Sequence, residues 1–156
     1  MVEPSKIGPI NKDILDDDEA IKKLGDGDPS TFIELAASFD KDTLQPELTK
    51  MKAGVIANDY KVIRDTSHAI KGVCKYLQAN RAAGMCEKLH KAIDDKKYDL
   101  INTHYPSMIY EFTLLKKEVR KSLCKHNHTP FVESVPDDKN VPVAPKFAYA
   151  LNGLKK

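Results

Sequence analysis

The chain has 156 residues, of which 41% are hydrophobic and 31% charged, a composition typical of one globular domain with its own core. Its 25 basic and 23 acidic residues leave a formal net charge of +2, which excludes the strongly basic footprint of a general nucleic-acid-binding protein. The sequence holds no apolar run long enough to span a membrane and no apolar signal core near its start. Three widely spaced cysteines favour a reducing compartment over a disulfide framework. We therefore expect the cytoplasm, with the nucleus as an alternative.

The first predicted helix covers residues 13–23, where the acidic residues come first, as the helix dipole favours. Glycines at positions 25 and 27 end it. Asp28-Pro29 then matches an N-cap followed by a proline in the first turn of a second helix. The apolar phase of this helix slips after Phe39, and Pro46 lies at the slip. We therefore expect a kink or a short break at Pro46.

The middle of the chain has no proline between Leu48 and Tyr105, so long helices are allowed there. Asn58-Asp59 is a predicted cap of the third helix. The apolar residues of this helix recur at spacings of 3 and 4, which indicates one buried face. They are Val62, Thr66, Ala69, Ile70, Val73 and Leu77.

A fourth helix is predicted from Asn80, a turn at residues 94–97, and a long last helix after it. The apolar phase of the last helix continues across Pro106, so we expect this proline to kink the helix rather than end it. Its apolar residues are Ile101, Tyr105, Met108, Phe112, Leu115 and Val119. Several amphipathic helices with short connections and no predicted strand indicate an all-α, antiparallel helical bundle.

We divide the chain into an N-terminal segment with a short acidic helix (1–27), the helical bundle (28–125) and an extended tail (126–156). Four of the nine prolines lie in the last 31 residues, and residues 141–145 suit a polyproline conformation. The tail either has no fixed position, or its apolar residues dock on the bundle or on a partner. Those residues are Phe131, Phe147, Tyr149 and Leu151.

One face of the third helix is basic, with a histidine at its centre. Its residues, spaced 3, 4, 3 and 4 apart, are Lys61, Arg64, His68, Lys71 and Lys75. The only acidic residue between the two ends of this face is Asp65. Gly72 follows the histidine by one turn. Glycine in a helix interior costs about 1 kcal/mol relative to alanine, and the simplest reason for it here is that a partner must come close to His68.

These residue types favour phosphoryl chemistry at His68. Neutral imidazole is a nucleophile, and neighbouring cations disfavour its protonated form and would stabilise a phosphoryl group carried on the ring. A basic face would also steer a partner with an acidic pocket. We therefore predict reversible phosphoryl transfer through His68. The alternative is a solvated basic face with no chemical role.

The segment Ser67-His68-Ala69-Ile70-Lys71-Gly72 resembles the H-x-x-K-G hallmark of the histidine-containing phosphotransfer (HPt) family of phosphorelays. Residues 28–39 are similar to the helix that precedes the histidine helix in this family, and Asn58-Asp59 to the turn between them. Cys86-Glu87 and the long last helix also lie where the family has similar residues. The resemblance covers about 28–125. It implies an antiparallel four-helix bundle of HPt type with an extra N-terminal helix and an extended, proline-containing tail.

The resemblance also implies a role, that of a phosphoryl carrier without independent catalytic activity. His68 would be the phospho-acceptor in a relay between receiver domains of a hybrid histidine kinase and of a response regulator. Lys71 would lie beside the phosphoryl group, and Gly72 would let the receiver approach. The residues expected to bind the partner are Lys61, Arg64 and Lys75. The receiver would supply Mg²⁺, so we expect no cofactor of the chain's own, no nucleic-acid or membrane partner, and a monomer.

Other functions have weaker support. A non-catalytic module that binds a receiver or another protein through the same face is the main alternative, and a helical cofactor carrier lacks a converging set of ligands. Cys124-Lys-His126-Asn-His128 supplies one pair of possible metal ligands, whereas zinc sites usually need two. We therefore predict no metal site. Cys74 and Cys86 fall near apolar faces and are predicted to be buried.

The chain departs from the family pattern at two informative positions. Gln78 stands where the family often has a glycine, which concerns the shape of the turn. His90 stands where many members have a glutamine that hydrogen-bonds the active histidine. If the chain reverses near Ala79, His68 and His90 lie 11 residues on either side of it and meet at one level of an antiparallel helix pair. A hydrogen bond between the rings would fix the tautomer of His68 and free its opposite nitrogen; the alternative is a half-buried core histidine.

Overall fold

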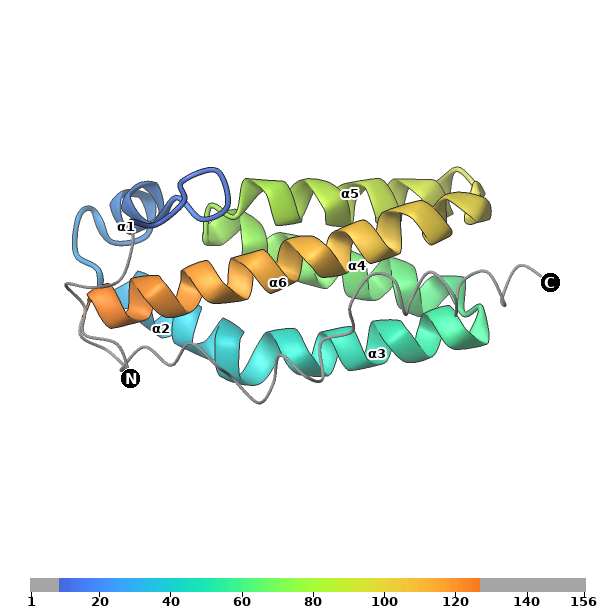
Figure 1. Ribbon diagram of the computed structural model, residues 1–156, viewed down its shortest axis with the longest axis horizontal. Helices are drawn as coiled ribbons and strands as arrows, with labels where there is room; N and C mark the ends of the chain where they lie inside the picture. The colour runs from blue at the N-terminus through green and yellow to red at the C-terminus, as the bar shows by residue number, and fades with distance from the viewer. Residues whose placement is uncertain (1–8, 127–156) are drawn as a thin grey trace.

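The computed structural model describes residues 9–126, and within that range the chain is helical, with no strand. The elements are α1 (Asp17–Gly25), α2 (Ser30–Ser38), η2 (Phe39–Thr43), α3 (Leu44–Ala57), α4 (Tyr60–Tyr76), α5 (Asn80–Asp94), η3 (Tyr98–Leu100) and α6 (Ile101–Lys125). Helices α3, α4, α5 and α6 run side by side along the long axis, and α1 and α2 gather at one end (Figure 1). The predicted all-α class is confirmed for these residues. The predicted tail, apart from His126, lies outside them.

Aromatic side chains from α2, η2 and α6 fill the centre of the core. Phe32, Phe39, Tyr105 and Phe112 are each at most 1% exposed. Burying a side chain of this size contributes about 1.5–3 kcal/mol. All six apolar residues predicted to line the last helix are buried. The apolar residues of α6 therefore form one shared core with those of α2 and η2.

The path from α2 to α3 bends at the π-helical segment η2. The Leu44 N–H donates to the carbonyl of Phe39, five residues earlier, and this wider turn lets both Phe39 and Leu44 point into the core. Pro46 is the third residue of α3, directly after the π-helical turn, where it has no N–H to donate to that turn. The prediction of a break at Pro46 is therefore wrong by a few residues: the irregular turn precedes the proline.

The connection from α3 to α4 matches the predicted cap. Asn58 ends α3 in the left-handed conformation, with φ of 54°, and the Asp59 carboxylate accepts a hydrogen bond of 3.2 Å from the Val62 N–H. Gly54 lets the two helices approach closely, because a Cβ at this position would lie 3.0 Å from Cγ1 of Val62. Cap and glycine together fix how α4 leaves α3.

The buried face of α4 is rotated relative to the predicted one. Thr66, Ile70 and Leu77 are buried as predicted, but Ala69 is exposed, and Val62 and Val73 are half-buried. The additional buried residues are Ile63, Ser67 and Cys74. The rotation follows from α4 packing against both α3 and α5, which a periodicity measured on one helix does not reveal.

The α4–α5 turn reverses the chain at the predicted place. Gln78 takes the left-handed conformation, with φ of 61°, and the Ala79 N–H donates to the Cys74 carbonyl at 2.8 Å, the pattern of a Schellman cap. The turn thus has the backbone that glycine would favour, built with a glutamine. Ala79 is fully buried, and α5 returns alongside α4 from Asn80.

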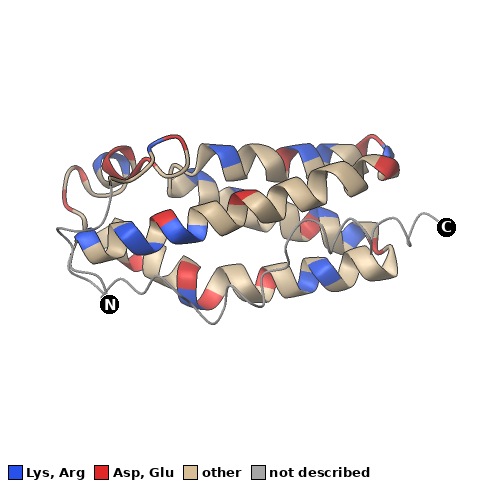
Figure 2. Cartoon of the chain, viewed as in Figure 1, with Lys and Arg blue, Asp and Glu red and all other residues tan. Residues whose placement is uncertain are grey.

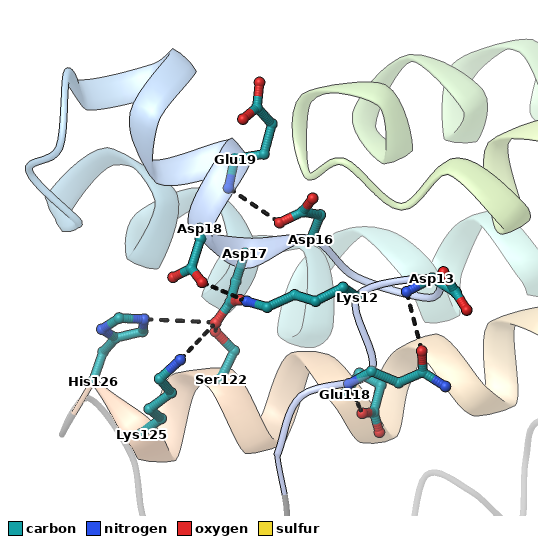
Figure 3. A network of polar contacts seen from close by, with 11 residues as sticks. Lys12, Asp13, Asp16, Asp17, Asp18, Glu19, Glu118, Ser122, Lys125 and His126 are labelled. Atoms are coloured by element: carbon teal, nitrogen blue, oxygen red, sulfur yellow. Dashed lines mark hydrogen bonds and ion pairs between the residues drawn. The ribbon is translucent and has the colours of Figure 1, made fainter.

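The N-terminal segment is held against the end of α6 by a buried carboxylate. Asp17 is fully buried; it accepts a hydrogen bond of 2.9 Å from Ser122 Oγ, pairs with Lys12 and lies 3.6 Å from Lys125 Nζ (Figure 3). Burial alone would raise the pKa of Asp17, but the hydrogen bonds from Lys12 and Ser122 and the charge of Lys125 hold that pKa below its ordinary value. The carboxylate is therefore ionised inside the fold.

The first helix begins later than predicted, at Asp17 rather than at residue 13. Leu15 is fully buried in the non-helical turn that precedes it. The Asp16 N–H donates to the Gln78 carbonyl at 3.2 Å, and the Asn11 N–H donates to Glu118 Oε1 at 2.8 Å. The segment before α1 therefore touches both the α4–α5 turn and α6.

The last turn and the last helix agree with the predictions. Lys96 has φ of 59°, and the Lys97 N–H donates to the Ala92 carbonyl at 2.8 Å, which closes the turn after α5. Helix α6 continues through Pro106 without ending. The turn brings α6 back alongside α5, and in Figure 1 α6 lies in front, between α5 and α3, with α4 behind.

Candidate functional site

His68 lies near the middle of α4 and is exposed to solvent. The side chains of Arg64 and Lys71 are one turn before and one turn after it. Among residues 9–126, His90, His104 and His126 are all partly covered, so His68 is the one exposed histidine in this part of the chain. The fold therefore presents this ring on the outside of the bundle.

Helix α5 places a partner beside each of these three residues. Lys71 pairs with Glu87, His68 faces His90, and Arg64 pairs with Asp94. The members of each pair lie eight, eleven and fifteen residues, respectively, on either side of the reversal at Ala79. We call these three pairs the α4–α5 ladder. Helix α5 carries both basic and acidic residues (Figure 2), and its acids Glu87 and Asp94 lie opposite the bases Lys71 and Arg64 of α4.

The middle rung of the ladder joins two imidazole rings. The ring centroids of His68 and His90 are 5.4 Å apart, with an angle of 35° between the planes. The described part of the chain has no hydrogen bond between the two rings, so the bond predicted between them stays a prediction. The His90 side chain is 15% exposed, and its Nε2 lies 3.6 Å from Asp94 Oδ2. The two histidines predicted to share one level of the bundle therefore do so.

The outer rungs are ion pairs. Lys71 Nζ lies 2.5 Å from Glu87 Oε2, and Arg64 Nε lies 2.6 Å from Asp94 Oδ1. The hydrogen bond from Lys71 lowers the pKa of Glu87 below its ordinary value, and the one from Arg64 lowers the pKa of Asp94. Both carboxylates are therefore ionised at neutral pH, and each neutralises a cation next to His68.

This charge balance corrects the picture of a free basic face. Lys61 is also paired, with Asp65 at 2.7 Å, and the hydrogen bond and charge of Asp65 raise the pKa of Lys61. Of the four predicted cations, Lys75 alone forms no ion pair with residues 9–126. The sequence pattern missed this because three of the four cations find their acids on α4 itself or across on α5.

Gly72 lies on the open side of α4. A Cβ built at this position would meet no atom of the described chain within 4 Å. No internal contact within residues 9–126 therefore requires the glycine, in contrast to Gly54, where packing against α4 does. The space beside His68 that Gly72 leaves free is available to a molecule outside the chain.

Comparison with known proteins decides the family. A family model described as the Hpt domain matches residues 41–119, a range that contains the whole α4–α5 ladder and Gly72. The chain belongs to the Hpt domain family. No curated protein and no solved structure matches it.

Membership of the Hpt family connects the site to a process. Hpt domains take part in phosphotransfer in two-component phosphorelays and interact with the receiver domains of phosphorelay proteins. The predicted resemblance is confirmed by the match. The Hpt match covers residues 41–119, so α1, α2 and the end of α6 lie outside it.

Two residues of the site were not predicted to have a role in it. The sequence marks Glu87 only as part of a dipeptide similar to one in the family, and Asp94 only as the start of a predicted turn. The signal that could have found them is the reversal at Ala79, since the count that pairs His68 with His90 also pairs Lys71 with Glu87 and Arg64 with Asp94. The prediction of a basic face rests on the residues of α4 alone, whereas the net charge around His68 depends on both α4 and α5.

The structure also places the cysteines and the candidate metal ligands of this Hpt protein. Burial raises the pKa of the Cys86 thiol to about 12 and that of Cys74 well above its ordinary value, so both stay protonated, and both are buried as predicted. Within residues 9–126 no three metal-ligating side chains cluster; His128 of the predicted pair lies outside this range. No helix of the described part combines the length and apolar character that a membrane crossing needs.

Proposed function

We propose that this Hpt protein carries a phosphoryl group on His68 and relays it between receiver-domain aspartates of a hybrid histidine kinase and a response regulator. The observation that carries this proposal is the exposure of His68 beside an unfilled space at Gly72, while the other described histidines are partly covered. A phosphoryl donor bound to another protein can reach only a ring of this kind. The partners are proposed from the family, whose members bind receiver domains.

The proposed transfer needs little from the carrier beyond a positioned nucleophile. A ring nitrogen of His68 attacks the phosphorus of the receiver's aspartyl phosphate, the N–P bond forms, the O–P bond breaks, and the aspartate leaves as a carboxylate. The receiver provides the Mg²⁺ that neutralises the phosphoryl oxygens, so the chain supplies no cofactor. The protein is thus a carrier rather than an independent enzyme.

The neighbours of His68 have proposed roles in the same step. Lys71 contacts the phosphoryl group after leaving Glu87, and Gly72 gives the receiver room to approach. His90 accepts the N–H of His68 and so keeps the attacking nitrogen unprotonated. The residues proposed to contact the receiver are Lys61, Arg64 and Lys75.

We also propose the finer features of the fold and setting that the family resemblance implies. Helices α3 to α6 form the four-helix unit, and α1 is an addition to it. The carrier acts as a monomer in the cytoplasm or the nucleus. Its charge balance supports the absence of a nucleic-acid partner, because 25 basic residues are offset by 23 acidic ones.

The decisive experiment is phosphoryl transfer from a ³²P-labelled receiver domain in the presence of Mg²⁺. The wild-type protein should take up label that is lost in acid and kept in base, as a phosphoramidate is. His68→Gln should take up none while keeping its helical circular dichroism, and His104→Gln, a change at a partly covered histidine, should label normally. Receiver binding by both wild type and His68→Gln, without labelling of either, would favour the alternative of a non-catalytic binding module.

A further inference from the structure

The Asp94 carboxylate is shared between the two helices of the ladder. Its Oδ1 lies 2.6 Å from Arg64 Nε, and its Oδ2 lies 3.6 Å from Nε2 of His90, one turn earlier on α5. Arg64 therefore holds one oxygen from α4, and the other oxygen faces the ring that stands beside His68. The contacts form a closed path from α4 to α5 and back, through Arg64, Asp94, His90 and His68.

This arrangement decides where neutral His90 carries its proton. A lone pair on Nε2 would point toward an ionised carboxylate 3.6 Å away, which is repulsive, whereas an N–H there is attracted to it. The neutral ring then has its proton on Nε2 and a free lone pair on Nδ1. A histidine in this tautomer can accept a hydrogen bond through Nδ1.

The other charges around His90 do not replace this effect. Helix α4 contributes His68 and the Arg64 guanidinium, and α5 itself contributes Glu87, which is held by Lys71. At the interface between α5 and α6, the charge of Lys88 acts on His104, and Arg81 pairs with Glu111. Neither pair includes His90. The carboxylate that pairs with His90 is that of Asp94.

We propose that Asp94 is a positioning residue: anchored by Arg64, it fixes His90 as the Nε2–H tautomer, so that Nδ1 of His90 accepts the N–H of His68. This inference rests on the proposed function of His68. When His68 attacks, its ring gains a positive charge as the N–P bond forms and the aspartyl O–P bond breaks. The ring N–H proton can then pass to Nδ1 of His90, and the resulting imidazolium lies beside the Asp94 carboxylate.

The test compares Asp94→Asn with Asp95→Asn, which removes the neighbouring carboxylate. Asp95 is a matched control because it is exposed and, within residues 9–126, pairs only with Lys91, at 4.0 Å. Long-range ¹H–¹⁵N NMR spectra of the unphosphorylated full-length protein report the tautomer of each histidine ring. We expect His90 to be mainly the Nε2–H tautomer in wild type and Asp95→Asn, and a mixture in Asp94→Asn.

Transfer kinetics provide the second measurement. The rate of labelling from a phosphorylated receiver should fall about tenfold in Asp94→Asn, which is less than the roughly 10²-fold or more that a group transferring the proton itself contributes, because Asp94 acts through His90. The rate should recover partly in Asp94→Glu. An unchanged His90 tautomer in folded Asp94→Asn would overturn the proposal. If wild type takes up no label, the function proposed for His68 fails, while the NMR spectra still decide whether Asp94 sets the tautomer of His90.

Discussion

Glu87 on α5 holds the Nζ of Lys71 on α4 at 2.5 Å, and Lys71 lies one helical turn after His68. The Lys71 side chain is 13% exposed, so it lies along the seam between the helices rather than reaching into solvent. A phosphoryl group on His68 must therefore compete with the Glu87 carboxylate for this ammonium group. The resting protein and the phosphorylated protein should differ in the partner of Lys71.

Replacing Glu87 with glutamine should lengthen the lifetime of phosphohistidine on His68, because Lys71 no longer has a competing carboxylate. An exposed ion pair contributes about 0–1 kcal/mol, so the gain should reach up to about fivefold. The half-life of the ³²P label measures it. Asp65→Asn is the control, since its partner Lys61 lies farther from the ring.

The rate of phosphoryl transfer should fall more in Lys71→Ala than in Lys61→Ala, because Lys71 lies one turn from His68. Equal effects on the rate would mean that the two charges act only as a diffuse electrostatic field.

Receiver docking should depend on Lys75 more than on Lys61. Lys61 is already paired with Asp65 at 2.7 Å, whereas Lys75 has no ion pair within the described chain. Lys75→Glu should therefore weaken receiver binding several-fold more than Lys61→Glu, and added salt should weaken binding of the wild type. Isothermal titration calorimetry at two salt concentrations measures both effects. An affinity independent of salt would indicate apolar docking instead.

Phosphotransfer should fall at mildly acidic pH more steeply in wild type than in His90→Gln. A protonated His90 can no longer accept the N–H of His68. A glutamine amide keeps its carbonyl acceptor at all these pH values. Initial transfer rates between about pH 7 and 5.5 compare the two proteins. Superimposable pH profiles would leave His90 with a packing role only.

Asp17→Asn should lower the free energy of unfolding by about 2 kcal/mol at neutral pH, because it removes a buried charge with several donors. The pKa of Asp17 is lowered in the folded state, so its contribution is complete above the ordinary carboxyl pKa and is lost as the pH falls through the folded value. The difference between wild type and variant should therefore shrink below about pH 4. Urea unfolding at several pH values measures it; a difference independent of pH would mean that the charge does not stabilise the fold.

Gln78→Gly should raise the free energy of unfolding by about 0.5–1 kcal/mol. Gln78 has φ of 61°, a conformation that costs a side-chain-bearing residue energy and costs glycine none, although glycine loses more entropy on folding. Lys96→Gly, at φ of 59° in the turn after α5, is a matched comparison. A loss of stability in Gln78→Gly alone would show that the glutamine side chain stabilises the turn by contacts of its own.

The sequence predicted those parts of the structure that depend on one helix or one turn. The cap at Asp59, the reversal near Ala79 and the apolar residues of α6 follow from local chemistry and period, and each is confirmed. The meeting of His68 and His90 followed from counting residues on either side of the turn. These predictions needed no knowledge of the neighbouring helices beyond their direction.

The features that the sequence did not predict arise from contacts between distant segments. The rotation of the buried face of α4 toward Ile63 depends on how α3 and α5 pack against it. The apolar phase slip between Phe39 and Leu44 marks the wide turn of η2, but the predicted break was assigned to Pro46, which follows it. Asp17 reads as one of several acids at a helix start, and only the folded chain brings Ser122 to it across 105 positions.

The hydrogen bond from the Asp16 N–H to the Gln78 carbonyl links the N-terminal segment to the turn between the two helices that carry the site. It connects residues that precede the Hpt match to the α4–α5 turn, from which both helices of the ladder extend. A fragment trimmed to residues 41–119 would lose this tie together with the Asp17 contacts to α6. The boundary of the matched Hpt unit and the boundary of the smallest stably folded fragment would therefore be different, with α1 and α2 outside the first and part of the second.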